Sequence, residues 1–207
     1  MYVRTSEVRG DPARIDDGTR MVREEIFPAV TGMDGCVGMS LLVDRETGRC
    51  IATTSWESGD AMRASADTVR PLRDRAEQTL GTTSGSEVHQ WEVAVVHRDH
   101  AAPDGACARL TWLSGDPSMV DHAIDMYRMV VLPQIQDMEG FCSASLMVDR
   151  DAGRIVGTAA FESREALEAT RSAAASIRTG VVRELGATAD VEEMEIAFAH
   201  LHVPEMA

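Results

Sequence analysis

The chain has 207 residues, of which 44% are apolar and 26% are charged, and its formal net charge is −14. A chain of this length buries roughly 70% of its unfolded surface on folding, so it needs no disulfide or metal to hold it together. A balance this acidic argues against nucleic acid or an anionic membrane surface as a partner. The composition is that of a soluble globular protein.

Two residue types are missing altogether. Without lysine there is no Schiff-base nucleophile, and without asparagine there is no Asn oxyanion donor. A GC-rich genome explains both absences without any functional reason. The N-terminal stretch has no signal-peptide apolar run, and no segment approaches the ~20 apolar residues that span a membrane. A cytoplasmic protein is therefore expected, with four buried and reduced thiols rather than a redox or metal site: Cys36, Cys50, Cys107 and Cys142.

The sequence repeats itself without gaps at an offset of about 105 residues, with roughly 28 identities over about 100 positions. Gly10-Asp11-Pro12 matches Gly115-Asp116-Pro117, for example. A repeat of this size is a domain. We predict one domain over residues 1–98, a linker over 99–107 and a second domain over 108–207.

The first repeat opens with a predicted strand, Tyr2–Val8, which corresponds to Ala108–Leu113 in the second repeat. A helix follows, because Asp11 is suited to cap a helix start and Pro12 to occupy its first position. Four apolar residues at helical spacing form the predicted buried stripe of this helix: Ile15, Val22, Ile26 and Val30.

Two strands come next, Cys36–Val43 and Cys50–Glu57, joined by the turn sequence DRETG. Gly48 suits the left-handed position of a hairpin loop, and Gly153 repeats it in the second copy. This pattern predicts a β-hairpin in each repeat.

A second helix is predicted over Asp60–Leu80, capped by Ser58 and ended by Gly81. Pro71 predicts a kink or a break after Arg70. The last strand is predicted over residues 87–97. The second copy places the corresponding features at Ser163, residues 165–185, Gly180 as the weak point, Gly186 and residues 192–202.

The order β-α-β-β-α-β predicts an α+β ferredoxin-like unit with both helices on one sheet face. The strand sequences VGMSLLV, CIATTSW, WEVAVV and SASLMV are apolar or small on both faces, as in strands buried on both sides. We therefore predict two βαββαβ units packed sheet to sheet as an intrachain dimeric α/β-barrel.

At this level the chain resembles the antibiotic-biosynthesis-monooxygenase-like (ABM) family, duplicated in tandem. The strand-to-helix junctions TTSWESGDAM and TAAFESREAL carry the resemblance, and the runs DGCVGMSLLVDRETGRCIATTSWES and GFCSASLMVDR resemble conserved mycobacterial proteins of unassigned function. The family includes cofactor-free oxygenases and haem-degrading enzymes. The latter use an Asn on the first strand and a Trp and a His on the second helix, which this chain lacks. The resemblance therefore implies neither haem degradation nor any resident cofactor or metal.

Equivalent arginines on the two first strands, Arg4 and Arg109, are the strongest candidates for a binding site. Gln90, Glu92 and Glu195 are predicted to lie beside them on the face between the two sheets. Such pairs either stabilise a polar interior or form the polar end of a pocket for a carboxylate or quinone oxygen.

Small residues at Ser40 and Ser145 leave room for a cavity or allow close sheet packing, and Trp56 supplies a structural aromatic wall. The seven candidates for the pocket are thus Arg4, Arg109, Ser40, Ser145, Glu92, Glu195 and Trp56. Histidines His97, His200 and His202 suggest a metal site, but strand-end surface histidines explain the same pattern.

Two functions follow from this sequence. One is a small-molecule-binding or interaction module that takes a small apolar or aromatic ligand and allows homo-oligomers. The alternative is a cofactor-independent monooxygenase acting on an aromatic or polyketide-like molecule. Fold alone does not decide between them, so whether the chain is an enzyme stays open at this point.

Overall fold

The computed structural model describes residues 1–82 and 84–201. Within them the chain forms two compact units. Unit 1 contains Met1–Trp91 and the end of the last strand from Ile196 onward, and unit 2 contains Glu92–Glu195. The predicted domain limits at residues 98 and 108 stay a prediction.

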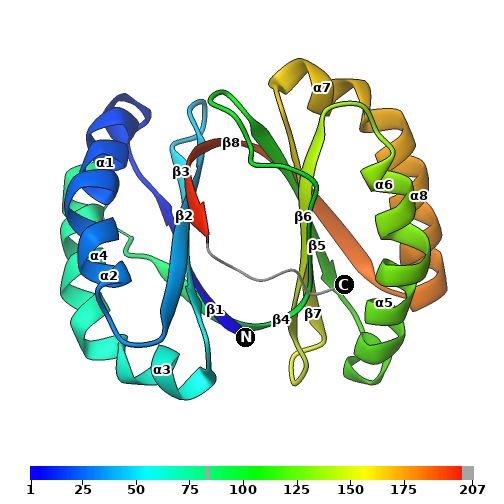
Figure 1. Ribbon diagram of the computed structural model, residues 1–207, viewed down its shortest axis with the longest axis horizontal. Helices are drawn as coiled ribbons and strands as arrows, with labels where there is room; N and C mark the ends of the chain where they lie inside the picture. Colours follow the sequence, from blue (N-terminus) through cyan, green and yellow to red (C-terminus); the bar gives the residue numbers. More distant parts are fainter. Residues whose placement is uncertain (83, 202–207) are drawn as a thin grey trace. The chain divides into compact units, whose positions relative to one another are not determined.

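Unit 1 has the predicted β-α-β-β-α-β order, with its first helix built from several segments (Figure 1). Its helices cover one face of its strands, and the core lies between them. The elements are β1 (Tyr2–Arg9), η1 (Pro12–Arg14), α1 (Ile15–Met21), η2 (Val22–Ile26), α2 (Phe27–Thr31), β2 (Cys36–Asp44), β3 (Arg49–Trp56), α3 (Gly59–Ala64), α4 (Ala66–Leu80) and β4 (Glu87–Arg98). The boundary between the two units crosses β4 after Trp91.

Unit 2 repeats the same order at the same spacing, with its own core between strands and helices. The last strand begins several residues earlier than predicted. The elements are β5 (Cys107–Ser114), η3 (Pro117–Met119), α5 (Val120–Met126), η4 (Tyr127–Val131), α6 (Leu132–Gln136), β6 (Phe141–Asp149), β7 (Arg154–Phe161), α7 (Arg164–Ala169), α8 (Arg171–Leu185) and β8 (Thr188–Leu201).

The eight strands are hydrogen-bonded in the closed order β1-β3-β2-β8-β5-β7-β6-β4. In unit 2, β5 pairs antiparallel with both β7 and β8, so that Arg109 lies opposite Ala159 on one side and Glu193 on the other. The α+β class and the tandem dimeric-barrel arrangement predicted from the repeat are confirmed.

Local sequence explains where the elements begin and end. The carboxylate of Asp11 accepts a hydrogen bond from the Ala13 amide, and the hydroxyl of Ser58 accepts one from the Ala61 amide, as the capping rules predict. Gly81 ends α4 with φ +70°, and Gly48 closes its hairpin with φ +74°. Both are left-handed positions that favour glycine.

The first helix of each unit contains one widened π-helical turn, η2 in unit 1 and η4 in unit 2. In unit 1 the Phe27 amide bonds back to Val22, five residues earlier. Pro28 follows immediately; it has no N–H, and its ring would clash with the carbonyl four residues before it in a regular α-helix. The widened turn relieves that clash and keeps Val22 and Ile26 in the core.

The break in the second helix does not lie where the proline predicted it. α4 runs through Pro71 without interruption, although a proline inside a helix removes one backbone hydrogen bond. The break lies at Ser65, whose hydroxyl bonds the Met62 carbonyl. Likewise α8 is continuous through Gly180, and the break lies at Thr170.

Candidate functional site

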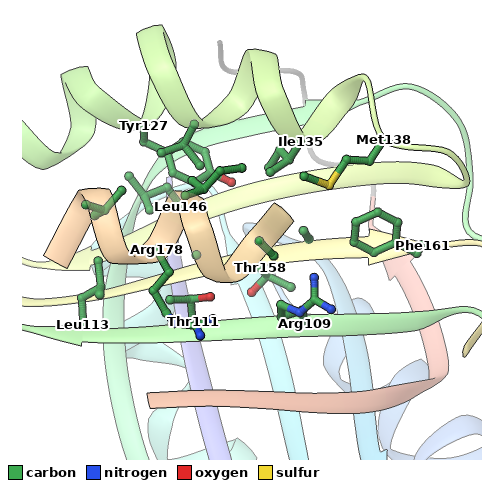
Figure 2. A pocket seen from close by; sticks show the side chains of 16 residues that line it. Arg109, Thr111, Leu113, Tyr127, Ile135, Met138, Leu146, Thr158, Phe161 and Arg178 are labelled. Atoms are coloured by element: carbon green, nitrogen blue, oxygen red, sulfur yellow. The ribbon is translucent and has the colours of Figure 1, made fainter. Parts of the chain in front are cut away.

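Unit 2 contains a cavity of about 90 Å³ between its strands and its helices (Figure 2). Residues of β5, β6 and β7 line it on the side of the strands, and residues of η4, α6 and α8 line it on the side of the helices. Most of its surface is apolar. The side chains that define it are Leu113, Tyr127, Ile135, Met138, Leu146, Phe161, Ile177 and Val181, with Arg109 and Arg178 as the charged members.

Small residues at three lining positions leave this space open. Gly157, Ala159 and Ala174 line the cavity in unit 2. At the equivalent positions, 105 residues earlier, unit 1 has Ala52, Thr54 and Val69. Unit 1 also has Trp56, fully buried in its core, at the position of Phe161. Unit 1 thus has the larger side chains at these positions, whereas unit 2 has the larger ones at Tyr127, equivalent to Val22, and at Val181, equivalent to Ala76.

Arg109 provides the polar end of the cavity. Its side chain is only 6% exposed and binds three groups of unit 2. It donates to the Thr170 hydroxyl at 2.7 Å, to the Leu167 carbonyl at 2.9 Å and to the Glu193 carboxylate at 2.8 and 3.1 Å. These bonds tie β5 and β8 to the break between α7 and α8 and fix the guanidinium beside the cavity.

Glu193 lies between two arginines. Arg171 reaches its second carboxylate oxygen at 2.6 Å. Burial alone would raise the pKa of Glu193, but the hydrogen bonds from Arg171 and Arg109 outweigh it and hold that pKa below its ordinary value. The carboxylate stays charged at neutral pH and compensates the buried Arg109.

Arg4 is the equivalent arginine of unit 1. It binds a hydroxyl and a backbone carbonyl as Arg109 does, but no described carboxylate takes the place of Glu193. It donates to the Ser65 hydroxyl at 3.0 Å and to the Met62 carbonyl, and it lies over the Trp56 ring, 5.9 Å from the centroid. Val88 occupies the position equivalent to Glu193. Burial, followed by the nearby Arg73 charge, lowers the pKa of Arg4.

Tyr127, Arg178, Thr111 and Thr158 are the other polar residues that line the cavity. The Tyr127 hydroxyl donates to the Ser145 carbonyl at 3.4 Å, and burial raises the pKa of the phenol well above its ordinary value. Tyr127 is therefore a neutral hydrogen-bonding group at any physiological pH. Among the described residues that line the cavity, none is an acid, a histidine or a cysteine.

The predicted face and partner of the first-strand arginines are wrong. Arg4 and Arg109 point toward the helices of their own units, where they bind Met62 and Leu167, and not toward the other sheet. The acidic partner of Arg109 is Glu193, not Glu195, because the β5–β8 register puts Glu193 directly opposite it. Both faces of β5 carry buried residues, so alternation alone did not identify the helix side.

The other candidates are dispersed. Glu92 pairs with Arg150 at 2.8 Å on the surface, and that hydrogen bond, acting against burial, lowers the pKa of Glu92. Ser145 contributes its backbone carbonyl to Tyr127, and Trp56 and Ser40 belong to unit 1. Of the seven candidates only Arg109 lines the cavity. Their role in binding a ligand stays a prediction.

Sequence reasoning missed the residues that shape the cavity. Their signal lies in the repeat itself, at positions where one copy has a smaller side chain than the other, such as Ala174 against Val69.

The cysteines are free thiols, and burial raises the pKa of Cys50 and Cys142 to about 11. His202 lies outside the described residues.

His100, which the sequence did not single out, joins the segment after β4 to the turn before α7. Its Nδ1 lies 2.8 Å from Asp99 and its Nε2 lies 3.2 Å from Glu162. The hydrogen bond that the ring donates to Asp99 is the main cause of a raised pKa of His100, and Glu162 adds to it. The imidazole thus lies between two carboxylates of unit 2, which favour its protonated form.

We expect His100 to titrate above the ordinary histidine pKa of about 6.5 in an NMR pH titration. Because the folded-state pKa is raised, its stabilising contribution is complete below the unfolded-state pKa and is lost as pH rises through the folded-state value. Asp99→Asn should lower the midpoint more than Glu162→Gln does. A wild-type midpoint at or below 6.5 would show that the two carboxylates do not hold the proton.

In the described part of the chain, no helix is long and apolar enough to cross a membrane.

Solved structures of other proteins have a similar fold. The fold is similar to a putative monooxygenase from Fusobacterium nucleatum (10% identity, TM-score 0.74, 97% of this chain and 94% of that one). It is also similar to an anthrone oxidase-like protein (16%, 0.65, 97% and 92%). A Listeria monocytogenes protein related to antibiotic biosynthesis monooxygenases matches at TM-score 0.54, with 10% identity and 94% of each chain covered.

These identities are too low to carry more than the fold, which is that of the ABM proteins. No family model matches the chain. Sequence relatives are nearer. The uncharacterised Mycobacterium tuberculosis protein Rv2557 is 46% identical over 207 residues, all of this chain and 92% of that protein. Rv2558 is 46% identical over 208 residues, with 87% of its length covered. The chain therefore belongs to the family of the Mycobacterium tuberculosis proteins Rv2557 and Rv2558, and it has a tandem ABM-type barrel fold.

Proposed function

We propose that the protein binds a small aromatic molecule in the cavity of unit 2, with an oxygen of that molecule facing Arg109. The observation that carries this proposal is an apolar cavity with one buried guanidinium at its edge. Apolar walls with a few fixed polar groups are the usual composition of a small-molecule site. The arginine favours a carboxylate, a phenol or a quinone oxygen.

The size of the cavity limits the ligand. An apolar cavity of about 150 Å³ holds benzene, and the cavity here measures about 90 Å³. This cavity is smaller than the one that holds benzene. A single ring would enter it only after a shift of a flexible lining residue such as Met138. Several fused rings need a larger opening of the wall between α6 and α8.

Two substitutions that copy unit 1 into unit 2 test the proposal. Gly157→Ala adds a methyl group at ordinary contact distance, 3.5 Å from the Tyr127 ring and 3.8 Å from Leu146. Ala174→Val copies Val69 of unit 1. We expect the double variant to fold and to lose at least about tenfold in affinity for the ligand, a change of 1.4 kcal/mol or more in binding free energy.

The measurement is isothermal titration with phenol, benzoate and toluene, with thermal shifts as a second readout. Ala173→Val is the matched control, because it makes the same change at an exposed position of α8 outside the cavity lining. Benzoate and phenol should bind more tightly than toluene if Arg109 holds an oxygen. Unchanged binding in the cavity-filling variant, or no binding by the wild type, would refute the proposal.

The alternative is a cofactor-independent monooxygenase of an aromatic or polyketide-like substrate. Fold neighbours described as monooxygenases and as an anthrone oxidase-like protein support it. The described cavity lining has no acid, histidine or cysteine to act as a general base, so binding is the better supported function. Sustained oxygen uptake with anthrone, abolished by Gly157→Ala with Ala174→Val, would instead establish the oxygenase.

A further inference from the structure

A second concave surface of unit 2 lies between α5–α6 and α8. Figure 1 shows these helices on the side of unit 2 away from its strands. We call it the methionine groove. Its volume is about 1190 Å³, and its apolar residues are Met126, Met129, Val130, Met138, Ile177 and Val181. Met129 is 79% exposed and Val130 is 50% exposed, the two highest values among the large apolar side chains that the structure describes.

Unit 1 has a smaller groove of about 600 Å³ on the equivalent surface, and charged and polar residues line most of it. Its π-helical turn η2 carries Glu25, which forms an ion pair with Arg75 of α4. The equivalent residues of unit 2 are Val130 and Gly180. A Cβ atom built on Gly180 would meet nothing within 4 Å, so this side of α8 is open. Unit 2 therefore lacks the bridge between the two helices at this position and presents apolar side chains instead.

The exposed methionine follows the same pattern. Met129 is equivalent to Glu24 of unit 1, so unit 2 has two adjacent apolar residues where unit 1 has two adjacent acids. In unit 1 the residues at these two positions are exposed acids, so the fold itself does not require apolar side chains there. An apolar surface gathered in a concave site is typical of a place where another molecule binds.

The rim of the methionine groove is acidic. Asp125, Asp137 and Glu184 line it, and no arginine does so among the described lining residues. In the described part of the chain, Asp125 and Asp137 form no ion pair, and Glu184 lies 3.7 Å from His122. An occupant with basic residues around an apolar stripe would complement this rim.

We propose that the methionine groove binds an amphipathic helix of a partner protein, with arginine or lysine residues flanking its apolar stripe. A groove between two helices accepts a third helix through apolar anchors at i, i+3, i+4 and i+7. Methionine adapts its shape to such anchors. A second copy of this chain is disfavoured, since a symmetric contact would bring Asp125 and Asp137 near the same acids of the other copy.

The test uses a fluorescein-labelled synthetic peptide of about 18 residues, five helical turns, with leucine at helical spacing and arginine elsewhere. The decisive variant is Val130→Glu with Gly180→Arg. It recreates the ion pair of unit 1 across the groove and leaves the formal net charge at −14. Fluorescence anisotropy should give a 1:1 complex with the wild type and at least about tenfold weaker binding with this variant.

Two controls separate docking from general attraction between opposite charges. Met129→Glu adds negative charge at a side chain too exposed to affect folding. Attraction alone predicts tighter binding by this variant, whereas docking predicts weaker binding. Gln136→Glu adds the same charge at an exposed position of α6 outside the groove and should not weaken binding.

Weaker binding by both groove variants, with Gln136→Glu unchanged, supports the proposal. Equal affinity of the peptide for the wild type and for the Val130→Glu, Gly180→Arg variant would overturn it. So would equal binding of a peptide that has glutamate in place of arginine. A wild-type dimer in sedimentation that this variant dissociates would show that a second copy occupies the groove, and would also overturn it. The cavity ligand plays no part in these measurements, so they do not depend on the proposed function.

Discussion

Arg109→Ala should destabilise the protein by about 3–5 kcal/mol, the usual cost of leaving one member of a buried ion pair without its partner. Arg109 is 6% exposed and Glu193 15%. The substitution removes bonds to the Glu193 carboxylate, the Thr170 hydroxyl and the Leu167 carbonyl together. Glu193 would keep only Arg171, which is 55% exposed, as a cationic partner for a carboxylate that stays largely buried.

Urea denaturation of the variant and its controls measures this effect. Arg150→Ala is the matched surface control, because its pair with Glu92 is 42% and 34% exposed and is expected to contribute about 1 kcal/mol or less. The double variant of Arg109→Ala and Glu193→Ala should cost less than the sum of the two single variants, since both charges leave together. A loss for Arg109→Ala no greater than that for Arg150→Ala would mean that the guanidinium is solvated.

Gly48→Ala should cost about 3 kcal/mol or more, because two penalties combine there. Gly48 has φ +74°, and a Cβ atom on it would lie 2.1 Å from the Gly10 carbonyl oxygen. The Gly10 amide also donates to the Gly48 carbonyl at 2.9 Å, so the two segments cannot separate without losing that hydrogen bond. Unit 2 repeats this close approach between Gly153 and Gly115.

Gly85→Ala provides the control for the backbone part of that penalty. Gly85 has φ +72°, almost the same as Gly48, but a Cβ atom there would meet nothing within 4 Å. It should cost only the left-handed conformation, about 1–2 kcal/mol. The difference between the two variants, measured by urea denaturation, isolates the close approach of the hairpin to Gly10. Equal losses would show that the chain moves aside freely.

The fold could be derived from the sequence because several independent patterns agreed. The repeat defined the unit, and caps such as Asp11 and Ser58 and turns such as Gly48 marked its elements. Pro71 led to a wrong prediction of the helix break, since α4 continues through it at the loss of one backbone hydrogen bond. The real break depends on the Ser65 hydroxyl, which binds both the Met62 carbonyl and Arg4 from a strand 61 residues away.

The candidate site was harder to derive, for a physical reason. A cavity is the small volume left after many side chains have packed, and sequence alone cannot tell an open space from a collapsed one. Arg109 was found by its equivalence with Arg4, but its face was not, because Ala108 and Leu110 on one side and Cys107 and Arg109 on the other are all buried. Only the register with β8 identifies Glu193 as its partner.

The widened turn of the first helix bears on the history of the molecule. It occupies Val22–Ile26 in one unit and Tyr127–Val131 in the other, 105 residues apart, and a proline follows it at the same distance in both. One inheritance accounts for this coincidence more simply than two separate insertions. The single-domain ancestor already had the widened turn before its gene was duplicated and fused. Glu25 and Val130, which lie within that turn, therefore diverged afterwards, and only one of the two copies now has an ion pair there.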